Sequence, residues 1–159
     1  MGFVSLWKTV PYIERCRFKM NGNYELTLAV FYCQNVPGSD EGERRILEKK
    51  YGKALRLFPL PCSGRLDPVH LLRALEEFAD AAYVVACPKG NCRYFEGNSR
   101  AGKRVGKTRE LIEQIGLEGN RIGLVYGSKE NPETLSYQID KIRDGLSELG
   151  PSPVLKNMK

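Results

Sequence analysis

Four cysteines stand where this chain can do chemistry. Cys33, Cys62 and Cys87 each close an apolar run, and Cys92 follows Cys87 after the turn-forming letters PKGN. Thiolates bind metals and iron-sulfur clusters, and they exchange with disulfides. The chain has 159 residues and five cysteines, an odd number, and a domain of this length can bury a core without cross-links. A metal or redox role is therefore favoured over structural disulfides.

The apolar runs that end on these thiols alternate with amphipathic segments, which is typical of an α/β fold. Pro59 and Pro61 indicate that the second strand ends early or lies at an edge, because proline cannot donate to a sheet ladder. Strands are expected at 26–33, 54–62, 81–87 and 121–127, and helices at 39–52, 67–79, 99–116 and 131–149.

Consecutive strands of this kind form a parallel sheet with right-handed crossovers, so their carboxyl ends meet at one edge. We expect a four-stranded parallel sheet, flavodoxin-like and doubly wound, with strand order 2-1-3-4. In that order the thiols of Cys33, Cys62 and Cys87 fall within roughly 10 Å of one another. A turn at Gly90 brings Cys92 back to the same rim. The sequence therefore predicts a four-thiol site at the edge where open α/β sheets bind ligands.

The helices are placed by their caps and by a period of 3.6 residues. Asp67 is expected to cap the second helix with Pro68 in its first turn, and Asn131 to cap the last helix with Pro132 at its first position. The side chains expected to be buried are Val69, Leu72, Leu75 and Ala79, then Ala101, Val105, Ile112 and Ile115, then Leu135, Ile139, Ile142, Leu146 and Leu149.

Composition is that of an ordinary globular protein, with 28% charged and 42% hydrophobic residues. We find neither an apolar run of the roughly 18 to 20 residues that would span a membrane nor a secretion signal, so a cytoplasmic protein without a membrane span is expected. The expected organisation is an N-terminal extension at 1–25 that contacts a partner, an α/β domain at 26–150 and a frayed tail at 151–159.

Four neighbouring cysteines can serve as core residues, as zinc ligands, in disulfide exchange or as ligands of an iron-sulfur cluster. A lone buried cysteine is usually a small core residue, and structural zinc usually sits on C-x2-C knuckles in small domains. Disulfide exchange favours the same C-x-x-C spacing, and this spacing does not occur in the chain. An iron-sulfur cluster fits better, and zinc stays open as the alternative. His70 is the only histidine, is expected to be solvated, and cannot supply the pair of a Rieske-type cluster.

The chain from Leu28 to Gly150 resembles the delta, iron-sulfur subunit of methyl-viologen-reducing hydrogenase. The segments that carry the resemblance are FYCQN, LPCSGRLDP, LLRALEEFAD, ACPKGNCRYFEGN and IEQIGLEGNRIGL. Two departures stand out: Val36 occupies a position where family members often have a further cysteine, and PKGN replaces the common His-Pro-Gly-Asp.

The resemblance implies one 2Fe-2S cluster and one-electron transfer, with Cys33, Cys62, Cys87 and Cys92 at the family's cysteine positions. It implies a non-catalytic subunit that relays electrons between a heterodisulfide-reductase-like flavoprotein and a hydrogenase, formate dehydrogenase or other oxidoreductase in an anaerobic complex. Cys16 lies outside the resemblance and is a possible substitute ligand. The alternatives are a zinc-bound scaffold protein in the same type of complex and, less favoured, a free-standing flavodoxin-like FMN protein.

A net charge of +6 raises the question of an anionic partner. Arg100, Lys103, Arg104 and Lys107 recur at helical spacing and predict one basic face, which can dock an acidic partner or offset the charge of a cluster. Nucleic acid is not expected, because no recognisable nucleic-acid-reading motif accompanies the charge. The segment GNSRAGKR is similar to a phosphate-binding loop. Arg104 replaces the Ser or Thr that would hold magnesium there, so nucleotide binding is not expected.

Overall fold

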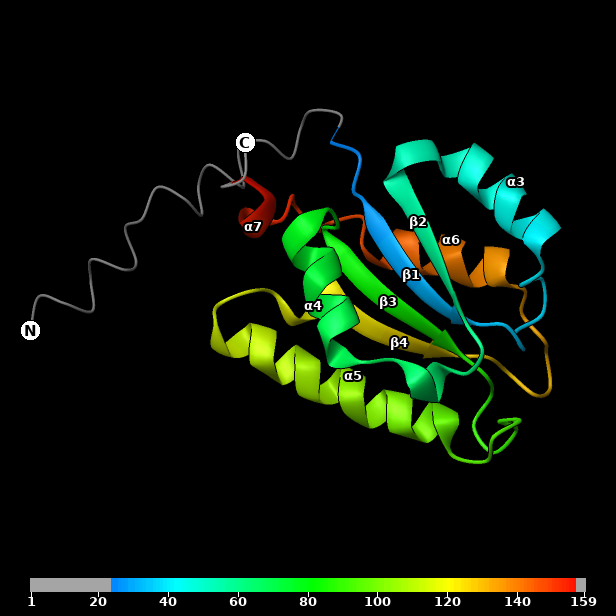
Figure 1. The fold of residues 1–159 in the computed structure, drawn as a ribbon. Coiled ribbons are helices and arrows are strands. Elements are labelled where there is room, and N and C mark those ends of the chain that lie inside the picture. Colours follow the sequence, from blue (N-terminus) through cyan, green and yellow to red (C-terminus); the bar gives the residue numbers. More distant parts are fainter. Residues whose placement is uncertain (1–23, 157–159) are drawn as a thin grey trace, which may run out of the picture.

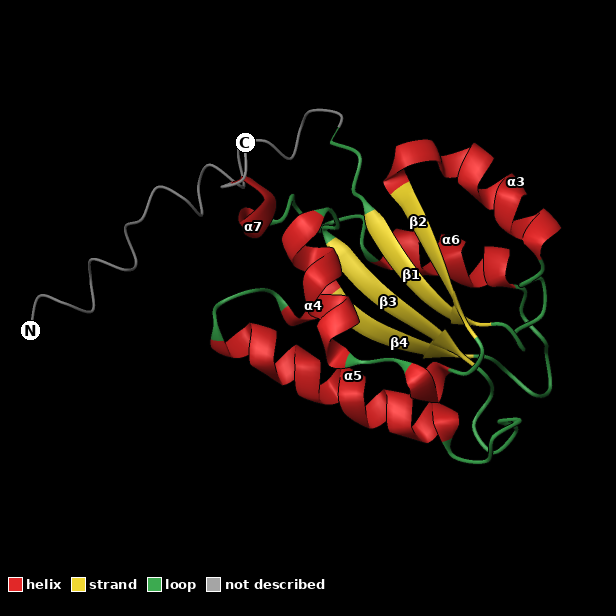
Figure 2. Ribbon diagram, viewed as in Figure 1, coloured by secondary structure: helices red, strands yellow, loops and turns green. Residues whose placement is uncertain are grey.

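A parallel sheet lies between two layers of helices in the computed structural model, which describes residues 24–156 (Figures 1 and 2). The strands, in the spatial order β2-β1-β3-β4, are β1 (Leu28–Cys33), β2 (Leu55–Leu60), β3 (Ala81–Ala86) and β4 (Ile122–Tyr126). The helices are α3 (Glu41–Tyr51), α4 (Pro68–Glu77), α5 (Gly97–Gln114), α6 (Leu135–Gly145) and α7 (Pro153–Lys156). Short 3-10 turns are η1 (Gly52–Ala54), η2 (Ser63–Arg65) and η3 (Gly119–Arg121). The α/β fold and the 2-1-3-4 strand order predicted from sequence are confirmed.

The two faces of the sheet are covered by different helices. In Figure 1, α4 and α5 lie in front of the sheet and α3 and α6 lie behind it. Every side chain of β1 is buried, and alternate residues serve opposite faces. Val30 packs in a cluster with Leu47 of α3 and Ile139 of α6, whereas Phe31 packs in a cluster with Leu75 of α4. The central strand is therefore rigidly held, and so is the thiol at its end.

Strand β2 lies at one edge of the sheet and pairs with β1 alone. Pro59, which lacks a backbone donor, is tolerated there because one side of an edge strand needs no ladder hydrogen bond. The edge placement read from the two prolines is confirmed.

Helix α4 begins with a complete capping box. The Asp67 carboxylate accepts a hydrogen bond from the Val69 N–H at 2.9 Å, and Nδ1 of His70 accepts one from the Asp67 N–H at 3.3 Å. A cap of this kind stabilises a helix by about 1 kcal/mol. The Asp67 cap and the exposure of His70 are confirmed, and the capping role of His70 is an addition that the sequence did not indicate.

The predicted start of the last helix at Asn131 and Pro132 is wrong. Helix α6 begins at Leu135, and the Thr134 hydroxyl caps it by accepting a backbone N–H of the first turn. The backbone N–H of Leu135 donates to the carbonyl of Pro37 at 2.8 Å. This tertiary contact with the loop after β1 decides where the helix begins, and local cap signals three residues earlier do not.

Two of the side chains expected in the core are exposed instead. Val69 is 49% exposed because it lies in the first turn of a short helix whose buried side is formed by Leu71, Ala74 and Leu75. Ile115 is 74% exposed because it follows the end of α5, where the helical period no longer positions it. The other expected core positions are buried or half-buried.

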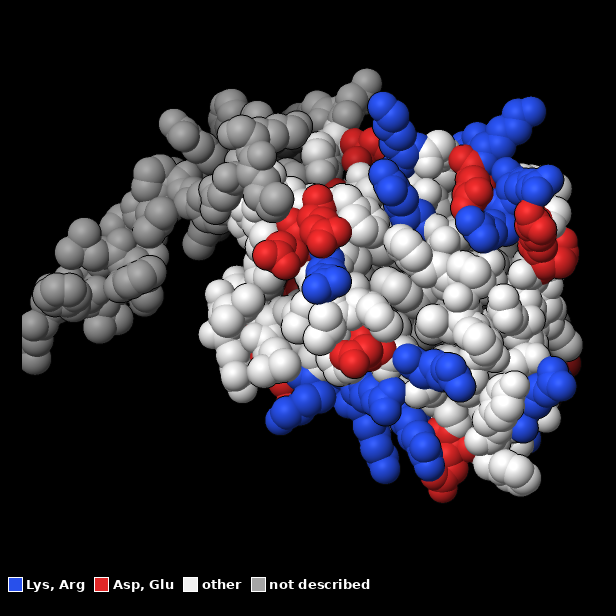
Figure 3. All heavy atoms as spheres, in the orientation of Figure 1, with Lys and Arg blue, Asp and Glu red and all other residues white. Residues whose placement is uncertain are grey.

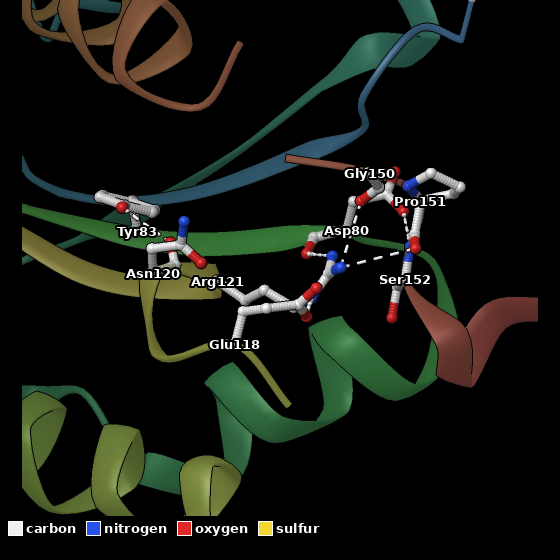
Figure 4. A network of polar contacts seen from close by, with 8 residues as sticks. All are labelled: Asp80, Tyr83, Glu118, Asn120, Arg121, Gly150, Pro151 and Ser152. Atoms are coloured by element: carbon white, nitrogen blue, oxygen red, sulfur yellow. Dashed lines mark hydrogen bonds and ion pairs between the residues drawn. The ribbon is translucent and has the colours of Figure 1, made fainter. Parts of the chain in front are cut away.

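A buried polar network closes the amino edge of the sheet, opposite the strand ends that carry the thiols (Figure 4). The Arg121 side chain is 1% exposed and donates to the Glu118 carboxylate at 2.7 Å and to the carbonyl of Asp80 at 2.9 Å. It also donates to the carbonyl of Gly150 at 3.2 Å.

The buried Asp80 carboxylate accepts from the Tyr24 hydroxyl and from the backbone N–H groups of Thr27 and Ser152. Residues 151–156 of the expected tail are held by the bond from Ser152 and by α7, which packs against α4. Within residues 24–156, the helices include none with the length and apolarity needed to cross a membrane.

Candidate functional site

The carboxyl ends of three neighbouring strands bring their cysteines together. Cys33 is the last residue of β1, Cys62 follows β2, and Cys87 directly follows β3. Cys92 lies in the loop between β3 and α5. The first three side chains are buried and that of Cys92 is half-buried. The predicted gathering of thiols at one sheet edge is therefore observed, and Cys16 lies outside the described residues.

Cys33 and Cys87 form one close pair. Their Sγ atoms lie 3.4 Å apart, because β1 and β3 are adjacent and both thiols project from the same end of the sheet. The side-chain amide of Asn35 approaches Sγ of Cys33 at 3.5 Å and reaches the carbonyl of Pro61 at 3.4 Å. Asn35 thus links the ends of β1 and β2 beside the thiol.

Cys62 and Cys92 form a second pair, with Gly97 at the start of α5 between them. A β-carbon at Gly97 would overlap Sγ of Cys62 and lie 3.2 Å from Sγ of Cys92. Gly64 meets the same glycine, since a β-carbon there would lie 2.7 Å from the α-carbon of Gly97. The backbone N–H of Gly64 points to Sγ of Cys62 at 3.4 Å. Two glycines therefore let the turn η2 and the start of α5 close around these sulfurs.

The thiols differ in acidity because their surroundings differ. Burial raises the pKa of Cys87 to about 12, and the neighbouring Cys33 thiol adds to the increase. Burial also raises the pKa of Cys62, although the Gly64 N–H counteracts it. Burial acts in the same direction on Cys92, but the backbone N–H groups of Tyr94, Asn98 and Gly97 outweigh it and lower the pKa. Thiolate binding to a metal displaces these protons, and preformed N–H donors are the groups that stabilise sulfur-borne negative charge.

The loop that carries Cys92 is braced from α5. The buried side chain of Asn98 donates to the carbonyls of Cys87 at 3.1 Å and Pro88 at 2.8 Å. Gly90 takes a positive φ of 71°, which permits the expected turn back to the rim. Gly64, Gly97 and Asn98 lie in the segments LPCSGRLDP and ACPKGNCRYFEGN, but the sequence did not indicate that they line the thiol site.

Two hollows open beside the thiols. One has a volume of about 440 Å³ and is lined by Cys62, Gly97 and the exposed Tyr94, with two arginines, Arg65 and Arg100. The other, of about 310 Å³, is lined by both Cys87 and Cys92, with Arg93 and Lys129 and one acidic residue, Glu133. The surroundings of the site are thus predominantly basic.

The basic face predicted on α5 is only partly free. The guanidinium of Arg104 donates to the carbonyls of Gly64 and Leu66, each at 2.7 Å, and so holds the turn that follows Cys62. Arg100 lies 3.6 Å from a Glu96 carboxylate oxygen, and Lys107 also has an acidic neighbour on the helix. Figure 3 shows that lysines and arginines gather along the margin formed by α5. Arg104 is exposed with the other residues of the predicted basic face, and its guanidinium also makes a structural contact. The GNSRAGKR letters lie within α5 and do not form a loop.

Among residues 24–156, no group of three or more His, Cys, Asp or Glu side chains is arranged to hold a metal ion. The four cysteines instead stand as two pairs, Cys33 with Cys87 and Cys62 with Cys92. Their joint role as ligands stays a prediction.

Comparisons with known proteins match this region of the chain. Residues 28–150 match the family model described as methyl-viologen-reducing hydrogenase, delta subunit. The vhu iron-sulfur subunit of the F420-non-reducing hydrogenase of Methanocaldococcus jannaschii is 32% identical over 105 residues, which are 66% of this chain and 78% of that protein. The corresponding vhc iron-sulfur subunit of Methanococcus voltae is 25% identical over 138 residues, 87% of this chain and 96% of that protein.

A further relative is much longer. It belongs to the ferredoxin/F420H2-dependent CoB-CoM heterodisulfide reductase of Methanosarcina acetivorans, and it is 33% identical over 102 residues, 64% of this chain but only 13% of that protein. In that relative, a unit similar to this chain is thus one segment of a larger polypeptide.

Proposed function

The chain belongs to the methyl-viologen-reducing hydrogenase delta subunit family, and from this membership we propose that it is an electron-transfer subunit carrying one 2Fe-2S cluster on Cys33, Cys62, Cys87 and Cys92. It passes single electrons between a flavoprotein and a catalytic oxidoreductase subunit, and does not itself transform a substrate. We place it in the cytoplasm.

The observation that carries the proposal is the arrangement of the thiols as two pairs at one sheet edge. A 2Fe-2S cluster takes four protein ligands, two on each iron. Cys33 and Cys87, with sulfurs 3.4 Å apart, would serve one iron, and Cys62 and Cys92, which share Gly97, the other. A structural zinc ion takes all four ligands on one centre. The paired arrangement fits the two-iron cluster better.

When bound, such a cluster supplies a one-electron couple at the rim of the sheet. The chain's own residues exclude water from three of the four sulfurs, which belong to buried cysteines. Backbone N–H groups of Gly64, Gly97 and Asn98 donate toward Cys62 and Cys92 and stabilise negative charge there. Burial and N–H donors are among the factors that set the reduction potential of a cluster.

For partners we propose a heterodisulfide-reductase-like flavoprotein on one side and a hydrogenase, formate dehydrogenase or similar oxidoreductase on the other. The support is that relatives carry hydrogenase names, and that a similar unit forms part of a longer heterodisulfide reductase polypeptide. Co-purification from the native host followed by mass spectrometry tests this. Recovery of the chain without either kind of partner would contradict it.

Anaerobic expression with iron tests the cofactor. We expect about two irons per chain and visible absorbance that dithionite bleaches, with each of Cys33→Ser, Cys62→Ser, Cys87→Ser and Cys92→Ser losing most of both. Cys16→Ser is the matched control and should keep both near wild type. Zinc in place of iron would favour the scaffold alternative. Loss of iron in Cys16→Ser with retention in Cys92→Ser would overturn the ligand set.

A further inference from the structure

Ser63, which directly follows Cys62, carries a buried hydroxyl that has no hydrogen-bond partner within the described residues. Its side chain is 1% exposed, and its Oγ accepts and donates no hydrogen bond within the described residues. A buried hydroxyl without a partner is unfavourable, by about 1–3 kcal/mol in typical proteins. Such a group calls for a partner that the protein chain does not supply.

The position of Ser63 limits what that partner can be. It directly follows Cys62 and opens the turn η2, whose next N–H, from Gly64, already points to Sγ of Cys62. The turn lies against β1 and β3, the strands that end at Cys33 and Cys87. The hollow beside Cys62 is lined by Gly64 and Arg65 of the same turn. Ser63 does not line it, because its side chain is buried in the interior.

We infer that the Ser63 hydroxyl donates a hydrogen bond to a sulfur of the bound iron-sulfur cluster and raises its reduction potential. This inference rests on the proposed function, since it requires a cluster at the four thiols. The reduced cluster carries one more negative charge than the oxidised cluster, so a donor at sulfur stabilises the reduced state more. The sulfurs of thiolate ligands and clusters are established acceptors of such bonds.

The test compares Ser63→Ala with a matched control. Ser152 is the other serine whose buried hydroxyl lacks a partner in the described part of the chain, also 1% exposed, and it lies at the opposite edge of the sheet. Ser63→Ala and Ser152→Ala therefore remove the same atom from equally buried sites, one beside the thiols and one far from them. The measured quantity is the midpoint reduction potential of the cluster in each cluster-containing protein, from a redox titration monitored by electron paramagnetic resonance.

We expect wild-type iron content in both variants and a more negative potential in Ser63→Ala alone. Loss of one hydrogen bond should shift the reduction equilibrium by up to about tenfold, which is about 59 mV for one electron. Ser63→Thr, which keeps the hydroxyl, should restore a potential near wild type. As a second reading, the cluster-free Ser63→Ala protein should unfold at the same or a higher denaturant concentration than wild type, because an unpaired hydroxyl has been removed.

Two failures are distinguishable. If the wild-type protein takes up no iron-sulfur cluster, the proposed function fails. If it takes up a cluster and Ser63→Ala matches Ser152→Ala in potential, the function stands and the role of Ser63 is overturned.

Discussion

At the scale of single residues, the site depends on glycine where α5 begins. A methyl group at Gly97 would overlap Sγ of Cys62 and crowd Sγ of Cys92. Gly97→Ala should therefore separate this pair and reduce iron content severalfold, measured as iron per chain after anaerobic purification. Gly106, on the same helix, has open space around it, so Gly106→Ala is the control. It should keep the iron and stabilise the fold by about 0.5–1 kcal/mol, the usual gain of alanine over glycine inside a helix. Equal iron contents in the two variants would show that Gly97 is not needed at the site.

At the scale of elements, the loop between β3 and α5 presents a strained aromatic residue beside the thiols. Phe95 has a φ of 60°, the one positive φ of a non-glycine residue in the described part of the chain, and its side chain is 91% exposed. Strain of this kind costs about 1–2 kcal/mol, persists where the surrounding structure holds the residue in place, and clusters at functional sites. We predict that Phe95 anchors the proposed flavoprotein partner, because exposed aromatic residues are frequent interface hot spots.

Phe95→Gly should raise the free energy of unfolding by about 1 kcal/mol, because glycine adopts positive φ without strain. Phe95→Ala keeps the strain but removes the ring, and both variants should bind the co-purifying partner at least tenfold more weakly, measured by surface plasmon resonance. Ile115→Ala, at the other end of α5 and 74% exposed in wild type, is the control and should bind normally. Equal affinities for Phe95→Ala and Ile115→Ala would remove Phe95 from the interface.

At the scale of the whole molecule, the two edges of the sheet have separate roles. The carboxyl edge holds the thiols, and the amino edge holds the buried network of Arg121 that ties β3 to the C-terminal segment (Figure 4). Arg121→Met leaves buried carbonyl groups without a donor, so we expect a loss of about 3 kcal/mol in stability, measured by urea unfolding. Arg109→Met is the control, since Arg109 is an exposed residue paired with Glu113 one helical turn away, and should cost less than about 0.5 kcal/mol. Iron content of folded Arg121→Met protein should match wild type, and loss of iron with unchanged stability would contradict the division of roles.

The sequence by itself determined the alternation of strands and helices, the edge position of β2 and the common edge of Cys33, Cys62 and Cys87. These properties follow from local periodicity and from the rule that parallel strands end on the same side. The family motifs then predicted that the four thiols act as one ligand set. Each of these inferences needs only residues that are neighbours along the chain, together with a general rule of topology.

Only the tertiary structure decided how the thiols pair and what surrounds them. The contact of Gly64 with Gly97 joins segments more than thirty residues apart, as does the bond from Arg104 to the carbonyl of Gly64. The start of α6 depends in the same way on the distant carbonyl of Pro37. Periodicity along one helix predicts which side faces the sheet, but it carries no information about which distant backbone group meets a given side chain. For that physical reason the contact of Arg104 with the turn after Cys62 and the unpartnered hydroxyl of Ser63 emerge only when the chain is folded.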